Sequence, residues 1–427
     1  MKDPRHDRIA DLLKIRLEEI RARDGDLGVR RQRPSARADS RNDGGSGDGR
    51  GAIGAVQNPL NTAGFQPSEG AAASVDHAIP RYGETFVASP DAAEVLTGRL
   101  NARVPGMLDV SCEAEVDQLR QRWLAAHRGK TPLEAVGGHP SHRHRDLIEV
   151  QELRQLRVAT GEAFDVKQRL AHTLALVPGV RDATAARLRD EGFADLEALC
   201  VHPRFGVHAR RLCRLIRQGD AAALMDPVGW RLGRSAPLAL ALSAFLEPSE
   251  LLFLDIETMG LFGGSPIVVA GLAHASGGAL QLRQLVASTP DAEAALVREV
   301  ADAVEAHKAL VTFNGRAFDW PYVCGRSAFW GRPVTTDPAH FDLLPFSRRA
   351  WRGSTTDCRL STLAREVLGL SRTEDLPWAL VPQFYAEYLD DPAGRAGLLA
   401  AIAVHNRHDV EETVRLYLAL VERGQRG

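Results

Sequence analysis

The sequence predicts an α/β fold for the C-terminal part of the chain, in which helices flank a mixed sheet. The apolar run LLFLDIET at 251–258 is typical of a buried strand. The stretches 266–275 and 279–287 indicate an antiparallel meander through a Ser-Gly-Gly turn. Helical periodicity then marks 291–307, and a second buried strand follows at 309–315. A right-handed crossover through that helix would place this strand parallel to the first.

Length and composition bound the rest of the chain. At about 100–200 residues per domain, 427 residues allow two or three domains, and a hydrophobic content of 44% supports a sizeable core. The net charge is −2, from 53 basic and 55 acidic side chains. Proteins that bind nucleic acid are often basic overall, so any such surface on this chain has to be local.

Cysteine usage and hydropathy predict a cytoplasmic protein without a membrane span. The five cysteines are scattered and form no Cys-x-x-Cys pair, which argues against a disulfide framework or a structural zinc site. No run of about 18 apolar residues occurs, and the charged first twenty residues do not resemble a signal peptide.

The N-terminal region shows little pattern that indicates a fold. Residues 1–22 predict a short amphipathic helix, with a docking helix as the alternative. Residues 23–75 are rich in Gly, Ser, Asp and Arg, and this composition predicts a disordered linker. Residues 76–145 remain without an assigned domain or function.

A mostly helical domain is expected at 146–226. Within it, 174–200 resembles a helix-hairpin-helix unit, with a turn at Pro178-Gly179-Val180 and a helix from about Ala183. In that motif, backbone N–H groups at a helix N-terminus bind phosphate. Arg181 stands where the motif usually has a second glycine. Gly179 and Arg181 are therefore candidate nucleic-acid contacts, and a purely structural turn stays open as the alternative.

Two carboxylates end the first strand of the α/β part. Asp255 and Glu257 are two residues apart, so on a strand they face the same side. Carboxylates held together and buried repel each other, and a bound cation relieves that repulsion. A pair of exposed acids at a strand end is the alternative.

Further polar residues follow in the C-terminal part. Asp319 comes after the strand at 309–315, where a short helix would project it toward the carboxyl ends of the parallel strands. His405 and Asp409 are four residues apart on a long predicted helix, 399–423, and share one face of it. A helix cap for Asp319, and an ion pair or core hydrogen bond for the other two, are the alternatives.

The order of these motifs resembles the DEDD superfamily of 3′–5′ exonucleases, whose fold is ribonuclease-H-like. Closer still, FNGRAFDWPYV (313–323), HFDLLPFSRRAW (340–351), CRLSTLAREVLGL (358–370) and HNRHDVEETV (405–414) resemble the YprB-like ribonuclease-H-like domain. The resemblance covers about 248–423 and predicts a nuclease domain at 248–427. Exonuclease subgroups have a histidine five residues before the last aspartate or a tyrosine four before it. This chain has Val404 and His405 at those positions.

The resemblance implies a metal-dependent nuclease that uses two ions, Mg²⁺ or Mn²⁺. By resemblance, Asp255 bridges both ions, Glu257 and Asp409 complete one, and Asp319 supports the second. His405 would orient or deprotonate the attacking water.

Nucleic acid, either DNA or RNA, is the partner that the resemblance implies, and protein partners are unknown from the sequence. The candidate contacts with the sugar-phosphate backbone are Asn314, Arg316, Arg348 and Arg349, with Arg326 and Arg352 beside them. For each arginine taken alone, an ordinary solvated side chain is the stronger interpretation. The alternatives to an enzyme are a catalytically silent nucleic-acid-binding module, which the four intact carboxylates argue against, and an interaction scaffold.

Overall fold

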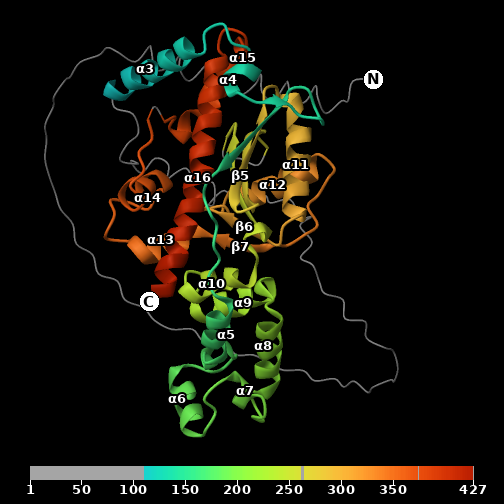
Figure 1. Cartoon of the computed structure of the whole chain (residues 1–427), viewed down its shortest axis with the longest axis vertical. Helices are drawn as coiled ribbons and strands as arrows, with labels where there is room; N and C mark the ends of the chain where they lie inside the picture. The colour runs from blue at the N-terminus through green and yellow to red at the C-terminus, as the bar shows by residue number, and fades with distance from the viewer. Residues whose placement is uncertain (1–109, 261–263, 374, 427) are drawn as a thin grey trace, which may run out of the picture. The chain divides into compact units, whose positions relative to one another are not determined.

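The computed structural model describes residues 110–260, 264–373 and 375–426, all of which belong to one structural unit (Figure 1). The sequence-based expectations of a helix at 1–22 and a disordered linker at 23–75 lie outside these residues. Among the described helices, none is both long enough and apolar enough to cross a lipid bilayer.

A seven-stranded mixed sheet forms the centre of this unit, in the order β1-β2-β5-β4-β3-β6-β7. β3, β6 and β7 are parallel, and the other neighbouring pairs are antiparallel. The expected meander and the parallel return strand are therefore confirmed. The strands are β1 (His139–Pro140), β2 (Leu147–Arg154), β3 (Leu251–Thr258), β4 (Ile267–Ser276), β5 (Ala279–Ala287), β6 (Ala309–Thr312) and β7 (Ala339–Asp342).

β2 corrects the start of the mostly helical domain predicted at 146–226, because 147–154 form a strand of the sheet. Its eight residues pair with β5 from Leu147 opposite Ala287 to Arg154 opposite Leu280. The first four residues of β2 are buried, and exposed and partly buried positions alternate after them. Strand formation here depends on a partner far away in the sequence, and local pattern gives little sign of such a partner. The sheet therefore extends beyond the predicted domain boundary at 248.

Helices cover both faces of the sheet, and the alternation along β3 assigns its residues to these faces. Leu252, Leu254 and Ile256 pack in a cluster with residues of α11 and α12. Phe253 points to the opposite face, where its ring lies 5.5 Å from that of Tyr417 in α16. The helices of this part are α11 (Glu293–Glu305), α12 (Asp319–Phe329), α13 (Leu343–Trp351), α14 (Leu360–Glu366), α15 (Val381–Asp390) and α16 (Ala396–Arg426).

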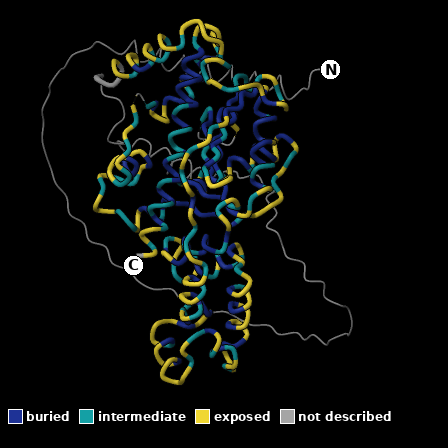
Figure 2. Tube along the Cα trace, in the orientation of Figure 1, coloured by how far each residue is buried: buried dark blue, intermediate teal, exposed yellow. Residues whose placement is uncertain are grey.

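The helical segment before β3 shares its core with the sheet and α16. The turn at 178–180 precedes a helix as predicted, and Gly179 adopts φ +84°, in the left-handed region that favours glycine. Buried residues of this segment form one cluster with Phe253, Val311 and Leu416. Its outer turns are largely exposed (Figure 2). The helices are α5 (Ala163–Ala171), η1 (Leu174–Leu176), α6 (Asp182–Asp190), α7 (Leu196–Leu199), α8 (Gly206–Gln218), α9 (Ala221–Leu232), α10 (Pro237–Ala241) and η2 (Leu242–Phe245).

Two shorter groups of helices complete the described chain. α3 (Val110–Ala126) and α4 (Pro132–Val136) pack against α16. Three single 3-10 turns lie at the junctions between larger elements: η3 (Pro248–Glu250), η4 (Pro290–Ala292) and η5 (Trp378–Leu380).

Candidate active site

Asp255 and Glu257 face α16, because they share the face of β3 that carries Phe253. α16 comes close at this point because Gly271, the residue of β4 opposite Asp255, has no side chain. A Cβ at position 271 would lie 2.4 Å from side-chain atoms of Asn406 and Val410. The register of the sheet and this glycine together allow residues of α16 to reach the carboxylates of β3.

Asn406 holds Asp255 in place from α16. Its Nδ2 donates to Asp255 Oδ2 at 2.8 Å and to the backbone oxygen of Asp255 at 3.2 Å. Gln284 of β5 donates to Asn406 Oδ1 at 2.9 Å, which fixes the amide. The sequence analysis did not identify Asn406, although it lies three residues before Asp409 and so on nearly the same helix face.

Asp319 reaches the same edge of the sheet from the first turn of α12, as predicted. Its Oδ1 accepts a hydrogen bond from the backbone N–H of Ile256 at 3.0 Å. The preceding turn is held by Asp342 at the end of β7, which accepts from the backbone N–H groups of Asn314 at 2.8 Å and Arg316 at 3.2 Å. Asn314 is the one described non-glycine residue with positive φ, at 65°.

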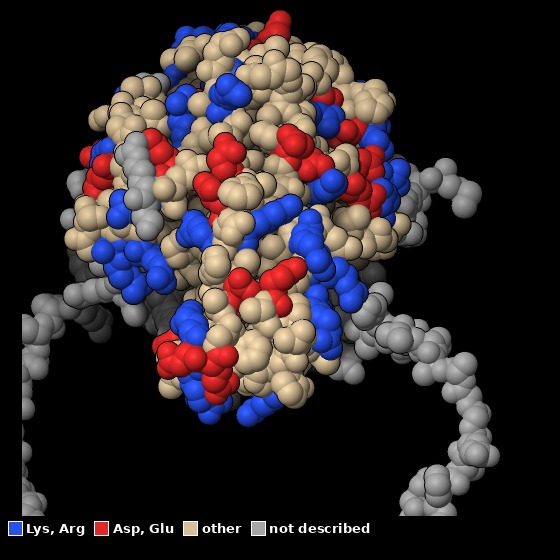
Figure 3. Space-filling view, turned by 60° about the horizontal axis from the view of Figure 1, so that its bottom comes forward, with Lys and Arg blue, Asp and Glu red and all other residues tan. Residues whose placement is uncertain are grey.

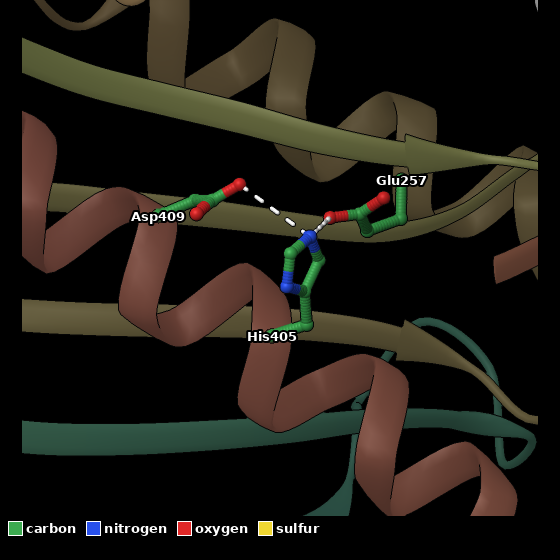
Figure 4. A group of neighbouring side chains, drawn as sticks. All are labelled: Glu257, His405 and Asp409. Atoms are coloured by element: carbon green, nitrogen blue, oxygen red, sulfur yellow. Dashed lines mark ion pairs between the residues drawn. The ribbon is translucent and has the colours of Figure 1, made fainter. Parts of the chain in front are cut away.

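His405 lies between Glu257 and Asp409 (Figure 4). Its Nε2 is 3.7 Å from Glu257 Oε1 and 3.6 Å from Asp409 Oδ2. Its Nδ1 lies 2.8 Å from Asp375 Oδ1. The predicted one-turn spacing of His405 and Asp409 therefore brings them together, and Asp375 adds an acid that the sequence analysis missed.

Arg372 supplies the positive charge on the outer side of the site. Its guanidinium pairs with Asp409 and Glu412 through Nη2, and Nη1 contacts Asp375 Oδ2 at 2.8 Å. Its Nε donates to Glu412 at 2.7 Å. Neither Arg372 nor Asp375 shows a periodic pattern in the sequence, because both lie in the irregular segment between α14 and η5.

The grouped carboxylates are poorly stabilised as anions. Burial, followed by the charges of Asp409, Asp319 and Glu257, raises the pKa of Asp255 well above its usual range. Burial raises the pKa of Glu257 to about 8, although the His405 charge opposes this, and burial raises the pKa of Asp319 to about 7. A divalent cation would stabilise the ionised forms. Glu257, His405 and Asp409 each offer a ligand atom, and these atoms lie within 4.8 Å of one another, so the residues present fit a metal ion.

His340 lies on β7 close to this edge of the sheet and is buried, with Nε2 2.8 Å from Thr312 Oγ1. Burial, and then the charge of Arg316, lowers the pKa of His340 to about 3. The folded protein therefore keeps this ring neutral, whereas the unfolded chain takes up a proton below about pH 6.5. The stability of the folded protein that depends on the neutral His340 ring is therefore fully present above about pH 6.5. It is lost progressively as the pH falls toward 3.

We therefore expect His340→Gln to lose less stability in acid than the unaltered protein. When the pH is lowered from 7.5 to 4.5, the unaltered protein should lose about 2–3 kcal/mol more unfolding free energy than the variant. This follows from about 1.4 kcal/mol for each pH unit below the histidine pKa of the unfolded chain. Urea unfolding without metal at both pH values measures this. The exposed His208→Gln is the control. Equal acid losses in His340→Gln and the unaltered protein would contradict the prediction.

Most of the residues predicted to bind nucleic acid are exposed, and one is buried. Arg348, Arg349 and Arg352 are exposed at the end of α13, and Arg181 and Gly179 are exposed at the start of α6. Asn314 is exposed beside the site, and Arg316 contacts the backbone oxygen of His340 through Nη2. Arg326 corrects the prediction, because it is buried and bonded to Glu293, so it is not available for phosphate.

The C-terminal part of the chain is similar to known proteins. A family model described as the RNase_H superfamily matches residues 252–421. The uncharacterized protein YprB of Bacillus subtilis (strain 168) is 34% identical over 174 residues, which are 40% of this chain and 41% of that protein. The chain thus matches less than half the length of this relative. A family B DNA polymerase from the hyperthermophilic archaeon Pyrobaculum calidifontis is similar over 42% of this chain and 24% of its own, with 20% identity and a TM-score of 0.31. The mixed sheet, its flanking helices and the family match show that the C-terminal part of the chain has a ribonuclease-H-like fold.

Proposed function

We propose that this domain hydrolyses phosphodiester bonds of nucleic acid with divalent cations, as a 3′–5′ exonuclease. The observation that carries the proposal is the meeting of Asp255, Glu257, Asp319 and Asp409 at one edge of the sheet. The pKa values of three of these acids are raised, so a bound cation would stabilise their ionised forms. The match to the RNase_H superfamily supports the same chemistry.

The arrangement supports a division of the carboxylates between two cations, Mg²⁺ or Mn²⁺. The charges of all three other acids act on Asp255, which suits a ligand shared by both ions. Glu257 and Asp409 both lie beside His405, whereas Asp319 follows the turn that Asp342 holds. Bound cations of this kind neutralise the phosphate and activate water. The protein contributes the fixed positions of its carboxylates through Asn406, the Ile256 N–H and Arg372.

The direct test is cleavage of single-stranded DNA and RNA oligonucleotides labelled at the 5′ end. The proposal predicts a ladder of products shortened from the 3′ end with Mg²⁺ or Mn²⁺, and none with a chelator present. Products from internal cuts would contradict the exonuclease assignment. Complete absence of metal-dependent products on both substrates would contradict the enzyme and favour a binding module.

A groove beside the site that contains three arginines offers the nucleic acid a path. The groove has a volume of about 240 Å³ and lies between α9 and the start of α13. Its charged lining consists of three arginines and two acids: Arg234, Arg316, Arg348, Asp226 and Asp342. Trp230, which is 75% exposed, also lines it. Arginines attract the phosphates, and an exposed indole offers a base a surface to stack on. On the face drawn in Figure 3, basic clusters are separated by acidic ones.

We expect Arg348→Ala and Arg181→Ala each to weaken the salt dependence of oligonucleotide binding. Each lost phosphate contact should lower the slope of log K against log salt concentration by about 1. Fluorescence anisotropy across a range of salt concentrations, with a chelator to prevent cleavage, measures this. Arg128→Ala is the matched control, since this exposed arginine follows α3. An unchanged slope for Arg181→Ala would assign the α6 turn a structural role only.

A further inference from the structure

The imidazole of His405 has a buried nitrogen without a hydrogen-bond partner. The residue is 5% exposed, and among the described residues its Nε2 is one of few buried side-chain polar atoms that lack a partner. Burying such an atom unpaired costs free energy. Nε2 points at Glu257 and Asp409, which come from β3 and from the next turn of α16 (Figure 4). A metal ion bound to the lone pair of Nε2, or a proton on Nε2, would satisfy this nitrogen.

Asp375 determines which ring nitrogen carries the hydrogen. Asp375 Oδ1 lies 2.8 Å from His405 Nδ1, and an ionised carboxylate can only accept a hydrogen bond. Nδ1 therefore carries the hydrogen, and in the neutral ring Nε2 presents its lone pair to the two other carboxylates. A carboxylate that orients a histidine in this way is the usual outer partner of a metal-binding imidazole.

Without an ion, the imidazole of His405 holds a proton: although burial opposes it, the charge of Asp409 and the hydrogen bond with Asp375 raise the pKa of His405 to about 9. The distances from Nε2 to the two carboxylates nevertheless fit a metal ion in place of that proton. A protonated Nε2 would form charge-assisted hydrogen bonds of about 2.7–2.9 Å to a carboxylate. The distances here, 3.6 and 3.7 Å, are too long for that. Two ligands about 2.1 Å from one tetrahedral ion lie roughly 3.4 Å apart, which is close to the observed values.

We infer that His405 is itself a metal ligand through Nε2, together with Glu257 and Asp409, and that this position prefers a transition-metal cation such as Zn²⁺ or Co²⁺ over Mg²⁺. Imidazole suits these metals, whereas Mg²⁺ takes oxygen ligands. Arg372 supports the arrangement by pairing with Asp409 Oδ1, which leaves Oδ2 directed at the site. This role differs from the water-orienting or base role expected for His405 from the sequence.

The inference rests on the metal site of the proposed function, but binding is measured without any substrate. The experiment is a titration of the metal-stripped full chain with Co²⁺, followed by its visible absorption, with Zn²⁺ and Mg²⁺ as competitors. We expect Co²⁺ bands that saturate, disappear with equimolar Zn²⁺ and persist in a hundredfold excess of Mg²⁺. His405→Gln should weaken Co²⁺ binding at least tenfold and change the spectrum, while Mg²⁺ binding changes less than threefold.

Two further variants separate the metal role from a packing role. Asp375→Asn keeps the imidazole but removes the carboxylate partner, and the loss of such a partner lowers metal affinity by about 10–100-fold. His274→Gln removes a half-buried histidine of β4 and should bind Co²⁺ like the unaltered protein. If His405→Gln does not fold by circular dichroism, Asp375→Asn decides the question.

Wild-type Co²⁺ affinity and spectrum in the His405 and Asp375 variants would overturn the inference. So would the absence of Co²⁺ binding, or its displacement by equimolar Mg²⁺. Mg²⁺-dependent cleavage in either of these cases would leave the proposed nuclease function standing. Conversely, the expected Co²⁺ spectrum in a protein that cleaves no oligonucleotide would support the metal site and contradict the nuclease.

Discussion

Asp255→Asn is expected to lower metal-dependent cleavage by about a thousandfold or more while the protein stays folded. Removal of a single preorganised electrostatic group from an active site typically costs about 10²–10³ in rate, and Asp255 is the proposed ligand of both cations. Asparagine keeps the shape of the side chain and its contact with Asn406. Single-turnover cleavage of a labelled oligonucleotide at saturating enzyme measures the loss.

The same variant should be more stable than the unaltered protein when no metal is present. Burial and three neighbouring acids disfavour the ionised form of Asp255, and a neutral amide removes that repulsion. Urea unfolding with a chelator should therefore show a higher midpoint for Asp255→Asn, with the difference reduced by added divalent cation. Asp337→Asn, which changes an exposed acid before β7, should leave both quantities unchanged. Full cleavage by Asp255→Asn would remove this residue from the metal site.

Pairs of site residues within one element could be predicted from the sequence because their geometry is local. Asp255 and Glu257 share a face by the two-residue repeat of a strand, and His405 and Asp409 share one by the four-residue spacing of a helix. The position of Asp319 also followed from local structure, since it depends on a strand, a turn and the start of a helix. These relations need no knowledge of tertiary packing.

The remaining parts of the site depend on packing between distant segments. Asp375 reaches His405 only because the segment between α14 and η5 folds over α16, and no periodic pattern encodes that path. Gly271 has a role only in the register that sets it opposite Asp255. β2 was missed for the same reason, because its partner strand lies more than 120 residues further along the chain.

Arg326 shows how a residue type can suggest the wrong role. The sequence places it among arginines that follow a metal-site motif, but the structure buries it, 3% exposed, against the fully buried Glu293. Its Nε donates to Glu293 Oε1 at 2.7 Å, and Nη2 pairs with the other carboxylate oxygen. Glu293 also accepts from the Ile267 N–H and from Trp330 Nε1, each at 2.9 Å. This carboxylate thus connects β4, α11 and α12.

Arg326→Ala is therefore expected to be the most destabilising of the arginine substitutions. Removing one partner of a buried pair leaves an uncompensated charge and typically costs about 3–5 kcal/mol, whereas an exposed substitution stays within about 0.5 kcal/mol. Urea unfolding with a chelator compares Arg326→Ala with Arg349→Ala, the exposed control on α13. The double variant Arg326→Met with Glu293→Gln should recover much of the loss, since glutamine remains neutral and still accepts from the Ile267 N–H. Equal losses of unfolding free energy in the two single arginine variants would mean that the Arg326–Glu293 pair does not stabilise the domain. A double variant less stable than Arg326→Ala would show that the Glu293 carboxylate stabilises the fold through its hydrogen bonds rather than its charge.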